Sequence, residues 1–154
     1  IVADFDMREI WEQYDSQVGG NTINCFENVA IVRLPNSTKA IAMITAANPY
    51  YCNYNPQLGV KSVIRHCHSH LSAVGSIPLA ITNCLNFGNP ENPEIMWEFA
   101  ETIEGMKVVC EELKFPVVSG NVSFYNETDG VSIFPTPVIG AVGLIENYEK
   151  KGIL

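Results

Sequence analysis

Apolar residues recur at helical spacing in three stretches of the chain, and each stretch predicts an amphipathic helix. The clearest covers residues 58–74. A second is expected over 92–114, because Asn92 can cap it and Pro93 suits its first turn. A third is expected over 5–16. The predicted buried positions are Val60, Val63, Ile64, Cys67, Leu71 and Val74 in the first helix, and Ile95, Phe99, Ile103, Met106 and Leu113 in the second.

Shorter apolar runs between these helices predict β-strands. The run PLAITNC at 78–84 is apolar almost throughout, which predicts a buried strand. The stretch 48–56 is rich in aromatic residues and bracketed by prolines, which predicts a loop. Further strands are expected at 28–34, 40–47, 116–124 and 137–146.

The predicted order is helix, two strands, helix, strand, helix and two strands. This order indicates one α+β (α/β-like) domain over residues 1–154, with a mixed sheet and helices on one face. Those few helices leave the second face of the sheet without cover. We therefore expect that face to meet another domain or subunit.

Composition narrows the classes of partner. The chain is 47% hydrophobic, which is typical of a globular protein, and its net charge is −8. An acidic chain without a cluster of lysines and arginines is a poor candidate for binding nucleic acid or an anionic membrane. No secretory signal and no long apolar run is evident, so we expect a cytoplasmic protein. The 5 cysteines are odd in number and form no CxxC pair, which argues against a disulfide framework or a zinc site.

Two segments that follow predicted strands carry candidate ligand groups. Asn83 ends one strand, and the run SGNVS contains Gly120, Asn121 and Ser123. A glycine lets a ligand approach the backbone, an amide oxygen can bind a hard cation, and a serine can donate to a phosphate oxygen. From the residue types alone, two ordinary turns explain these segments equally well.

His66 and His70 form a second candidate group on the predicted 58–74 helix. They are four residues apart and therefore share a face. A structural or catalytic zinc needs three or four protein ligands, and no third ligand is evident nearby. A solvated polar face is the favoured interpretation.

Longer motifs resemble a known family. The runs ITNCLNFGNPENPEIMWEF at 81–99, PVVSGNVSFYNET at 116–128 and PTPVIGAVGLIE at 135–146 are similar to phosphoribosylformylglycinamidine synthase, an enzyme of purine biosynthesis. LSAVGSIP at 71–78 is similar to a motif shared across the AIR-synthase-related superfamily. The resemblance covers nearly the whole chain.

The resemblance implies a specific place in a larger enzyme. Members of the family use ATP to convert formylglycinamide ribonucleotide to its amidine, with ammonia supplied by a glutaminase subunit or domain. The chain resembles the N-terminal-type domain of the second half of the synthase. The family's catalytic histidine lies in the first half, so the resemblance implies no catalytic residue here and no synthase activity for this segment alone. Such domains pair sheet to sheet, so an isolated copy is expected to form a homodimer.

Residue roles follow from the resemblance position by position. Gly120 matches a glycine that contacts ATP, Asn121 matches a Mg²⁺ ligand, and Ser123 matches a residue that contacts the ribonucleotide substrate. Asn83 stands where the family usually has a nucleotide-contacting aspartate. The amide keeps an acceptor, adds a donor and removes a charge.

A second departure from the family concerns an auxiliary nucleotide site found in some members. Its metal-binding carboxylates and amide correspond here to Ala46, His66 and His70. Loss of the carboxylates removes ligands that hard cations prefer. We therefore expect weak or absent binding of magnesium-nucleotide at that site.

Two alternatives remain at the level of sequence. The chain could be a non-catalytic scaffold or dimerisation domain with degenerate nucleotide loops. It could also belong to another enzyme of the superfamily, such as aminoimidazole ribonucleotide synthase or selenophosphate synthetase. The CLNFGNPE and SGNVSFYNET runs argue against the second alternative.

Overall fold

The computed structural model describes residues 22–23 and 28–150, so the helix expected over 5–16 lies outside the described residues. The elements in chain order are β1 (Thr22–Ile23), β2 (Ala30–Arg33), β3 (Ala40–Ala46), α2 (Pro49–Tyr54), α3 (Pro56–Ala73), β4 (Ile77–Asn86), α4 (Pro93–Leu113), β5 (Val117–Ser123), β6 (Glu127–Thr128), β7 (Val131–Ser132) and β8 (Thr136–Ile145).

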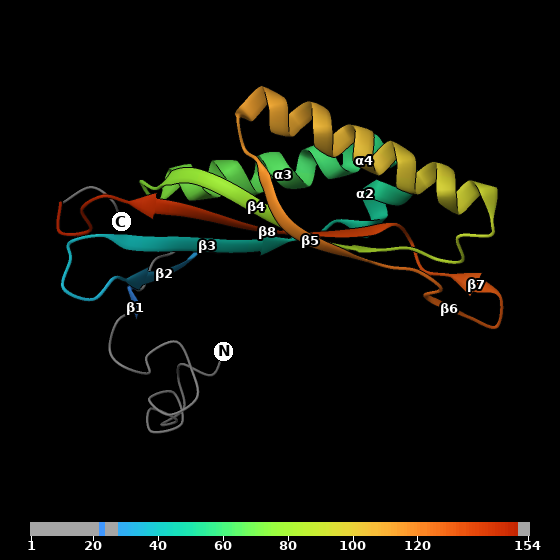
Figure 1. The fold of residues 1–154 in the computed structure, drawn as a ribbon, viewed down its shortest axis with the longest axis horizontal. Coiled ribbons are helices and arrows are strands. Elements are labelled where there is room, and N and C mark those ends of the chain that lie inside the picture. The colour runs from blue at the N-terminus through green and yellow to red at the C-terminus, as the bar shows by residue number, and fades with distance from the viewer. Residues whose placement is uncertain (1–21, 24–27, 151–154) are drawn as a thin grey trace, which may run out of the picture.

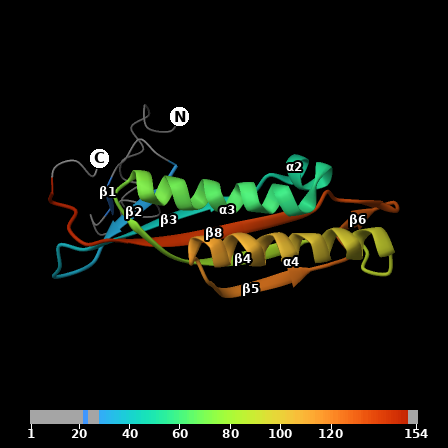
Figure 2. The same cartoon turned by 90° about the horizontal axis from the view of Figure 1, so that it is seen from above.

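A mixed sheet forms one layer and the helices form the other (Figure 1). The strand order is β1-β2-β3-β8-β4-β5, and β6 and β7 form a separate small ribbon. Neighbouring strands are antiparallel except for β4 and β5, which run parallel and are joined by α4. Figure 2 shows α3 lying along β8 and β3, and α4 lying over β4 and β5. The predicted α+β fold with helices on one face is confirmed.

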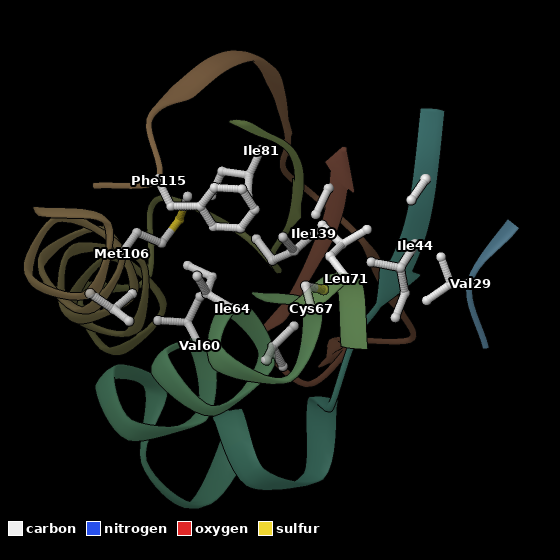
Figure 3. Close-up of a cluster of buried hydrophobic side chains, with 14 of the residues drawn as sticks. Val29, Ile44, Val60, Ile64, Cys67, Leu71, Ile81, Met106, Phe115 and Ile139 are labelled. Carbon is white, nitrogen blue, oxygen red and sulfur yellow. The ribbon is translucent and has the colours of Figure 1, made fainter. Parts of the chain in front are cut away.

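The core fills the space between the sheet and the two long helices (Figure 3). Ile64 and Leu71 of α3 are fully buried against the sheet, and Met106 of α4 and Phe115 close the side nearest β4. All the core positions expected on α3 are buried. On α4 the expectation is wrong at Ile103, which is 40% exposed because it faces the open edge beside β5.

The second face of the sheet carries exposed apolar side chains, and no described element covers it. Met43 of β3 and Val142 of β8 are directly opposite each other and are 37% and 38% exposed. Ile77 of β4 is 56% exposed. The expectation of an uncovered sheet face therefore holds for the part of the chain that the structure describes.

The loop expected at 48–56 is wrong, because a short helix, α2, forms there. The side-chain oxygen of Asn48 accepts a hydrogen bond from the backbone N–H of Tyr51 at 3.0 Å, and Pro49 occupies the first turn. Asn55 ends α2 and caps α3, since its side chain accepts from the N–H of Leu58 at 2.8 Å. Proline and asparagine at these places start helices rather than prevent them.

The strand expected to be buried at 78–84 is longer, and described residues cover only one of its faces. β4 extends to Asn86 and alternates, with Ile81 and Leu85 buried under the helices and Thr82 exposed on the open face. The apolar side chains of β4 therefore point to both faces of the sheet, and described residues cover only the helix-side face.

Candidate nucleotide and substrate site

The parallel pairing of β4 with β5 brings the four predicted site residues together. Asn83 of β4 lies opposite Gly120 of β5, and Asn86 lies opposite Ser123. Asn121 lies between Gly120 and Ser123 on β5, which is the edge strand. The pairing contains an irregularity between Ile81 and Thr82, which shifts the register of the following residues. Two segments that are far apart in the sequence thus form one surface at the edge of the sheet.

The four residues point to two different faces of the sheet. Successive side chains of a strand alternate, and paired residues share a face. Asn83 and Gly120 therefore lie on the helix side, with buried Ile81 and Leu85, whereas Asn121 and Ser123 lie on the open side. A ligand that contacts all four must pass around the edge strand β5 or contact its backbone.

Gly120 has a local structural reason to be glycine. A Cβ atom at this position would lie 2.7 Å from Cγ and 3.0 Å from Nδ2 of Asn83, which is closer than side-chain atoms pack. The amide of Asn83 therefore lies across the backbone of Gly120. The pair forms a polar contact surface without a protruding side chain on the edge strand.

An open groove of about 450 Å³ follows this edge between α4 and β5. Asn83 supplies a polar group, Ile103 of α4 supplies an apolar wall, and the remaining lining comes mostly from residues 117–122 of β5. Val118 is 69% exposed at the groove. The groove therefore combines an amide, backbone groups of an edge strand and apolar side chains, which is a surface suited to a ligand with both flat apolar and polar parts.

Asn121 is exposed, and its amide can offer one oxygen to a cation. Among the described residues, no group of three or more His, Cys, Asp or Glu side chains is placed to hold a metal ion. Mg²⁺ commonly takes few protein ligands and completes its shell with phosphate oxygens and water. Asn121 can therefore offer one ligand, and a Mg²⁺ ion at this position would need its other ligands from phosphate oxygens and water.

The turn after β5 is tied to the loop after β4 by Asn126. Its backbone N–H donates to the carbonyl of Phe87 at 3.2 Å, and its side-chain Nδ2 donates to the same carbonyl at 2.9 Å. Nδ2 also contacts the carbonyl and the hydroxyl of Ser123, at 2.9 and 3.2 Å. Tyr125, just before it, has a positive φ of 59°. Sequence reasoning missed Asn126, although asparagine is a common turn residue and this one lies three positions after the end of β5.

A second pocket lies between the end of β3 and helix α3. It has a volume of about 400 Å³ and is lined by Ala46, Asn48 and His66, among others. The ring centroids of His66 and His70 are 4.1 Å apart, but only His66 lines the pocket. Of the three positions matched to the auxiliary site, Ala46 and His66 therefore line the pocket, and His70 lies next to His66 outside the lining.

The described cysteines are free. Burial raises the pKa of the Cys52 and Cys67 thiols to about 11. Cys84 lies opposite Asn121 on the open face, with its Sγ 3.6 Å from Nδ2 of Asn86. Two of these thiols are therefore poor nucleophiles near neutral pH.

No helix among the described residues is both long and apolar enough to cross a lipid bilayer.

A family model decides the relationship of the chain to known proteins. The model described as "AIR synthase related protein, N-terminal domain" matches residues 26–145. The chain belongs to this family. The AIR synthase related domain is 50% identical over 145 residues to a protein of Parvibaculum lavamentivorans named phosphoribosylformylglycinamidine synthase subunit PurL. That match covers 94% of this chain and 20% of the relative, so the chain spans about a fifth of the relative's length.

Solved structures from Thermotoga maritima share the fold of this AIR synthase related domain. The structure of PurLQS superimposes with a TM-score of 0.80 at 30% identity, covering 91% of this chain and 24% of that chain. The structure of PurL complexed with ATP superimposes with a TM-score of 0.75 at 30% identity, and the match covers 90% of this chain and 23% of that chain. The structure of PurL complexed with FGAR superimposes with a TM-score of 0.76 at 31% identity, and this match also covers 90% of this chain and 23% of that chain. The similar backbones therefore include complexes with a nucleotide and with FGAR.

Proposed function

We propose that the AIR synthase related domain is the ATP- and substrate-contacting domain of a phosphoribosylformylglycinamidine synthase. This ligase converts formylglycinamide ribonucleotide, ATP and glutamine-derived ammonia to formylglycinamidine ribonucleotide in purine biosynthesis. The observation that carries the proposal is the β4–β5 edge, where Asn83, Gly120, Asn121 and Ser123 lie together. Its 50% identity to a PurL protein and its likeness to PurL structures with ATP and FGAR support the same proposal.

The proposed roles are those that the family resemblance implies, placed on the two faces of the edge strand. Gly120 and the amide of Asn83 would contact ATP from the helix side. Asn121 would provide an oxygen ligand to Mg²⁺ on the open side, and Ser123 would donate its hydroxyl to the ribonucleotide. Bound Mg²⁺ would neutralise part of the negative charge of the triphosphate. The chain's own residues would bind and align the two reactants, which lowers the barrier by positioning.

We propose that the chain is one domain of a longer cytoplasmic polypeptide and is inactive alone. Its span of about a fifth of its relative supports this. Groups that carry out the chemistry would lie on other domains, and ammonia would come from a glutaminase subunit or domain. The open sheet face, with Met43 and Val142 exposed, would pack against a second domain of the same type. In an isolated copy it would pack against a second copy.

The pocket beside β3 is proposed to have little affinity for magnesium-nucleotide. Ala46 and His66 line it, and neither offers the carboxylate oxygens that hard cations prefer. Calorimetric titration of the full-length protein with magnesium-nucleotide should therefore reveal one binding site. Two sites of similar affinity would contradict this.

Alanine substitutions at the open face test the proposed function in the full-length protein. Ser123→Ala should raise KM for the ribonucleotide about tenfold or more, because a hydrogen bond to a charged group is lost. Asn121→Ala should raise the Mg²⁺ concentration needed for half-maximal rate. Asn53→Ala, at an exposed position on α2, is the control and should change neither. Unchanged turnover in both site variants would favour a scaffold domain instead.

A further inference from the structure

The side chain of Asn83 is half-buried at the groove between α4 and β5, and its amide makes no hydrogen bond with any residue that the structure describes. The neighbouring amides of Asn86 and Asn126 are different, because each donates to two backbone carbonyls. Asn83 lies instead against Gly120, which has no side chain to pair with it. Polar groups that lose contact with water usually find partners. The donor and the acceptor of the Asn83 amide are therefore both left for water or a ligand.

Apolar side chains surround this amide on the helix side of β5. Val118 and Val122 project from the same face as Gly120, because alternate residues of a strand share a face. Their backbones lie about 13 Å apart, at a rise of about 3.3 Å per residue. Ile103 of α4 lines the same groove, and Figure 2 shows α4 lying over β4 and β5. The glycine therefore leaves a slot between two valines, with the Asn83 amide at its floor and an isoleucine beside it.

The residues that line the groove carry no charge. They are asparagine, serine, glycine and aliphatic residues. Lys107, one turn beyond Ile103 on α4, does not line the groove, and its Nζ lies 3.8 Å from Oε1 of Glu104. Phosphate groups need cationic partners or several donors, and a ribose is polar on nearly every side. A flat ring with apolar faces and a polar edge fits this lining better than either of them.

We propose that this groove binds the purine base of the nucleotide, with Asn83 bonded to the polar edge of the base and Ile103 packed against its ring. The proposal rests on the proposed function and deepens it, because it assumes that ATP contacts Asn83 and Gly120. The edge of adenine presents an amino donor beside a ring-nitrogen acceptor. The amide of an asparagine matches both groups at once. Specificity for the base would then depend on two side chains of this chain.

The edge strand β5 separates the base from the phosphates in this arrangement. Gly120 faces the groove, whereas the side chain of Asn121 points to the open face of the sheet. In the described sheet, β5 has a neighbouring strand on one side only, so a ligand can pass over its free edge. A nucleotide with its base beside Asn83 would bring its phosphates over that edge toward Asn121. One ligand would thus reach candidate residues on both faces.

A chemical double-mutant cycle in the full-length protein, with ammonia supplied directly, tests the contact with the base. ATP is compared with purine riboside triphosphate, which lacks only the exocyclic amino group of adenine. In the parent enzyme, loss of that group should lower kcat/KM about tenfold, because one half of a paired contact disappears. In Asn83→Ala the same loss should change kcat/KM less than about twofold, since the side chain that reads the group is already gone.

Ile103→Ala tests the groove independently of hydrogen bonding. Loss of its apolar contact should raise KM about fivefold for both nucleotides and leave KM for the ribonucleotide unchanged. Val108→Ala is the matched control, because Val108 has similar exposure on the same helix but does not line the groove. The control should change none of these constants.

The outcomes separate this inference from the proposed function. If Asn83→Ala lowers kcat/KM equally for the two nucleotides, Asn83 contacts another part of ATP. If Ile103→Ala leaves KM for both nucleotides unchanged, the base lies outside the groove. Either result overturns the base site and leaves the proposed function intact. If Asn83→Ala changes no constant for either nucleotide, and Asn121→Ala and Ser123→Ala leave turnover unchanged, the proposed function fails as well.

Discussion

At the scale of single residues, the candidate site depends on small side chains in close contact. Gly120 leaves room for the amide of Asn83, and Asn126 holds Ser123 through its donor nitrogen. The residue types of the site were predictable from the sequence, because glycine, asparagine and serine after strands indicate backbone approach and hydrogen bonding. That Gly120 faces away from Asn121 and Ser123 follows from strand alternation, but the placement of Asn83 beside Gly120 does not, because it depends on a register irregularity in the β4–β5 pairing.

Gly120→Ala should lower the free energy of unfolding by about 1–2 kcal/mol, because its Cβ would overlap the amide of Asn83. Urea unfolding would measure the change. In an Asn83→Ala background the same substitution should cost less than about 0.5 kcal/mol, since the overlapping atoms are gone. An equal cost in both backgrounds would show that the overlap with Asn83 is not the cause.

The buried thiols make stability sensitive to alkaline pH. Burial raises the pKa of Cys67 from 9.0 to about 11, so the unfolded chain loses this proton first as the pH rises. The free energy of unfolding should therefore fall between pH 9 and about 11. Cys67→Ala should give a smaller slope over that window than the parent chain, with tyrosines and lysines contributing equally to both. Identical slopes would contradict the prediction.

At the scale of elements, periodicity predicted the long helices well, and short elements were missed. α3 and α4 have wide apolar faces, so their spacing indicates them directly. α2 has one buried residue, Cys52, and depends on its caps instead. The ribbon of β6 and β7 turns at Asp129 and Gly130, both with positive φ. An Asp-Gly pair is a hairpin signal that the sequence contains, but strands of two residues carry no periodicity.

The side chain of Asn55 caps α3, so its removal should cost more than that of an ordinary exposed asparagine. Its backbone N–H donates to the Tyr51 carbonyl at 2.9 Å, and its side chain caps α3. Asn55→Ala should lower the free energy of unfolding by about 1 kcal/mol, whereas Asn55→Asp should retain the cap. Asn53→Ala, on exposed surface of the same helix, should change it by less than about 0.5 kcal/mol. Thermal unfolding of the three variants would measure these differences.

At the scale of the whole molecule, the sheet has one face under helices and one apolar face that no described element covers. The number of predicted helices made this arrangement predictable, because α3 and α4 are enough to cover a single face. The nature of the partner on the other face could not be derived from periodicity.

Val142→Lys should prevent the proposed self-association of the isolated chain without unfolding it. The side chain is 38% exposed at the open face, so a lysine can reach water in the monomer but would be buried in a dimer. Val108→Lys is the matched control, because Val108 is also 38% exposed but lies on α4. Sedimentation at high concentration should show a dimer for the parent and the control and a monomer for Val142→Lys. A monomeric parent chain would contradict the proposed pairing.

The position of β8 has a consequence for the order of events during synthesis. It is the last of the described strands, yet it lies in the middle of the sheet, between β3 and β4. In the sheet, the strands made first and the β4–β5 pair are hydrogen-bonded to each other only through β8. A nascent chain that has emerged as far as β7 therefore has two incomplete half-sheets with unpaired apolar edges. Chaperone binding or pausing that shields these edges until residues 136–145 emerge would protect the chain at its most aggregation-prone stage.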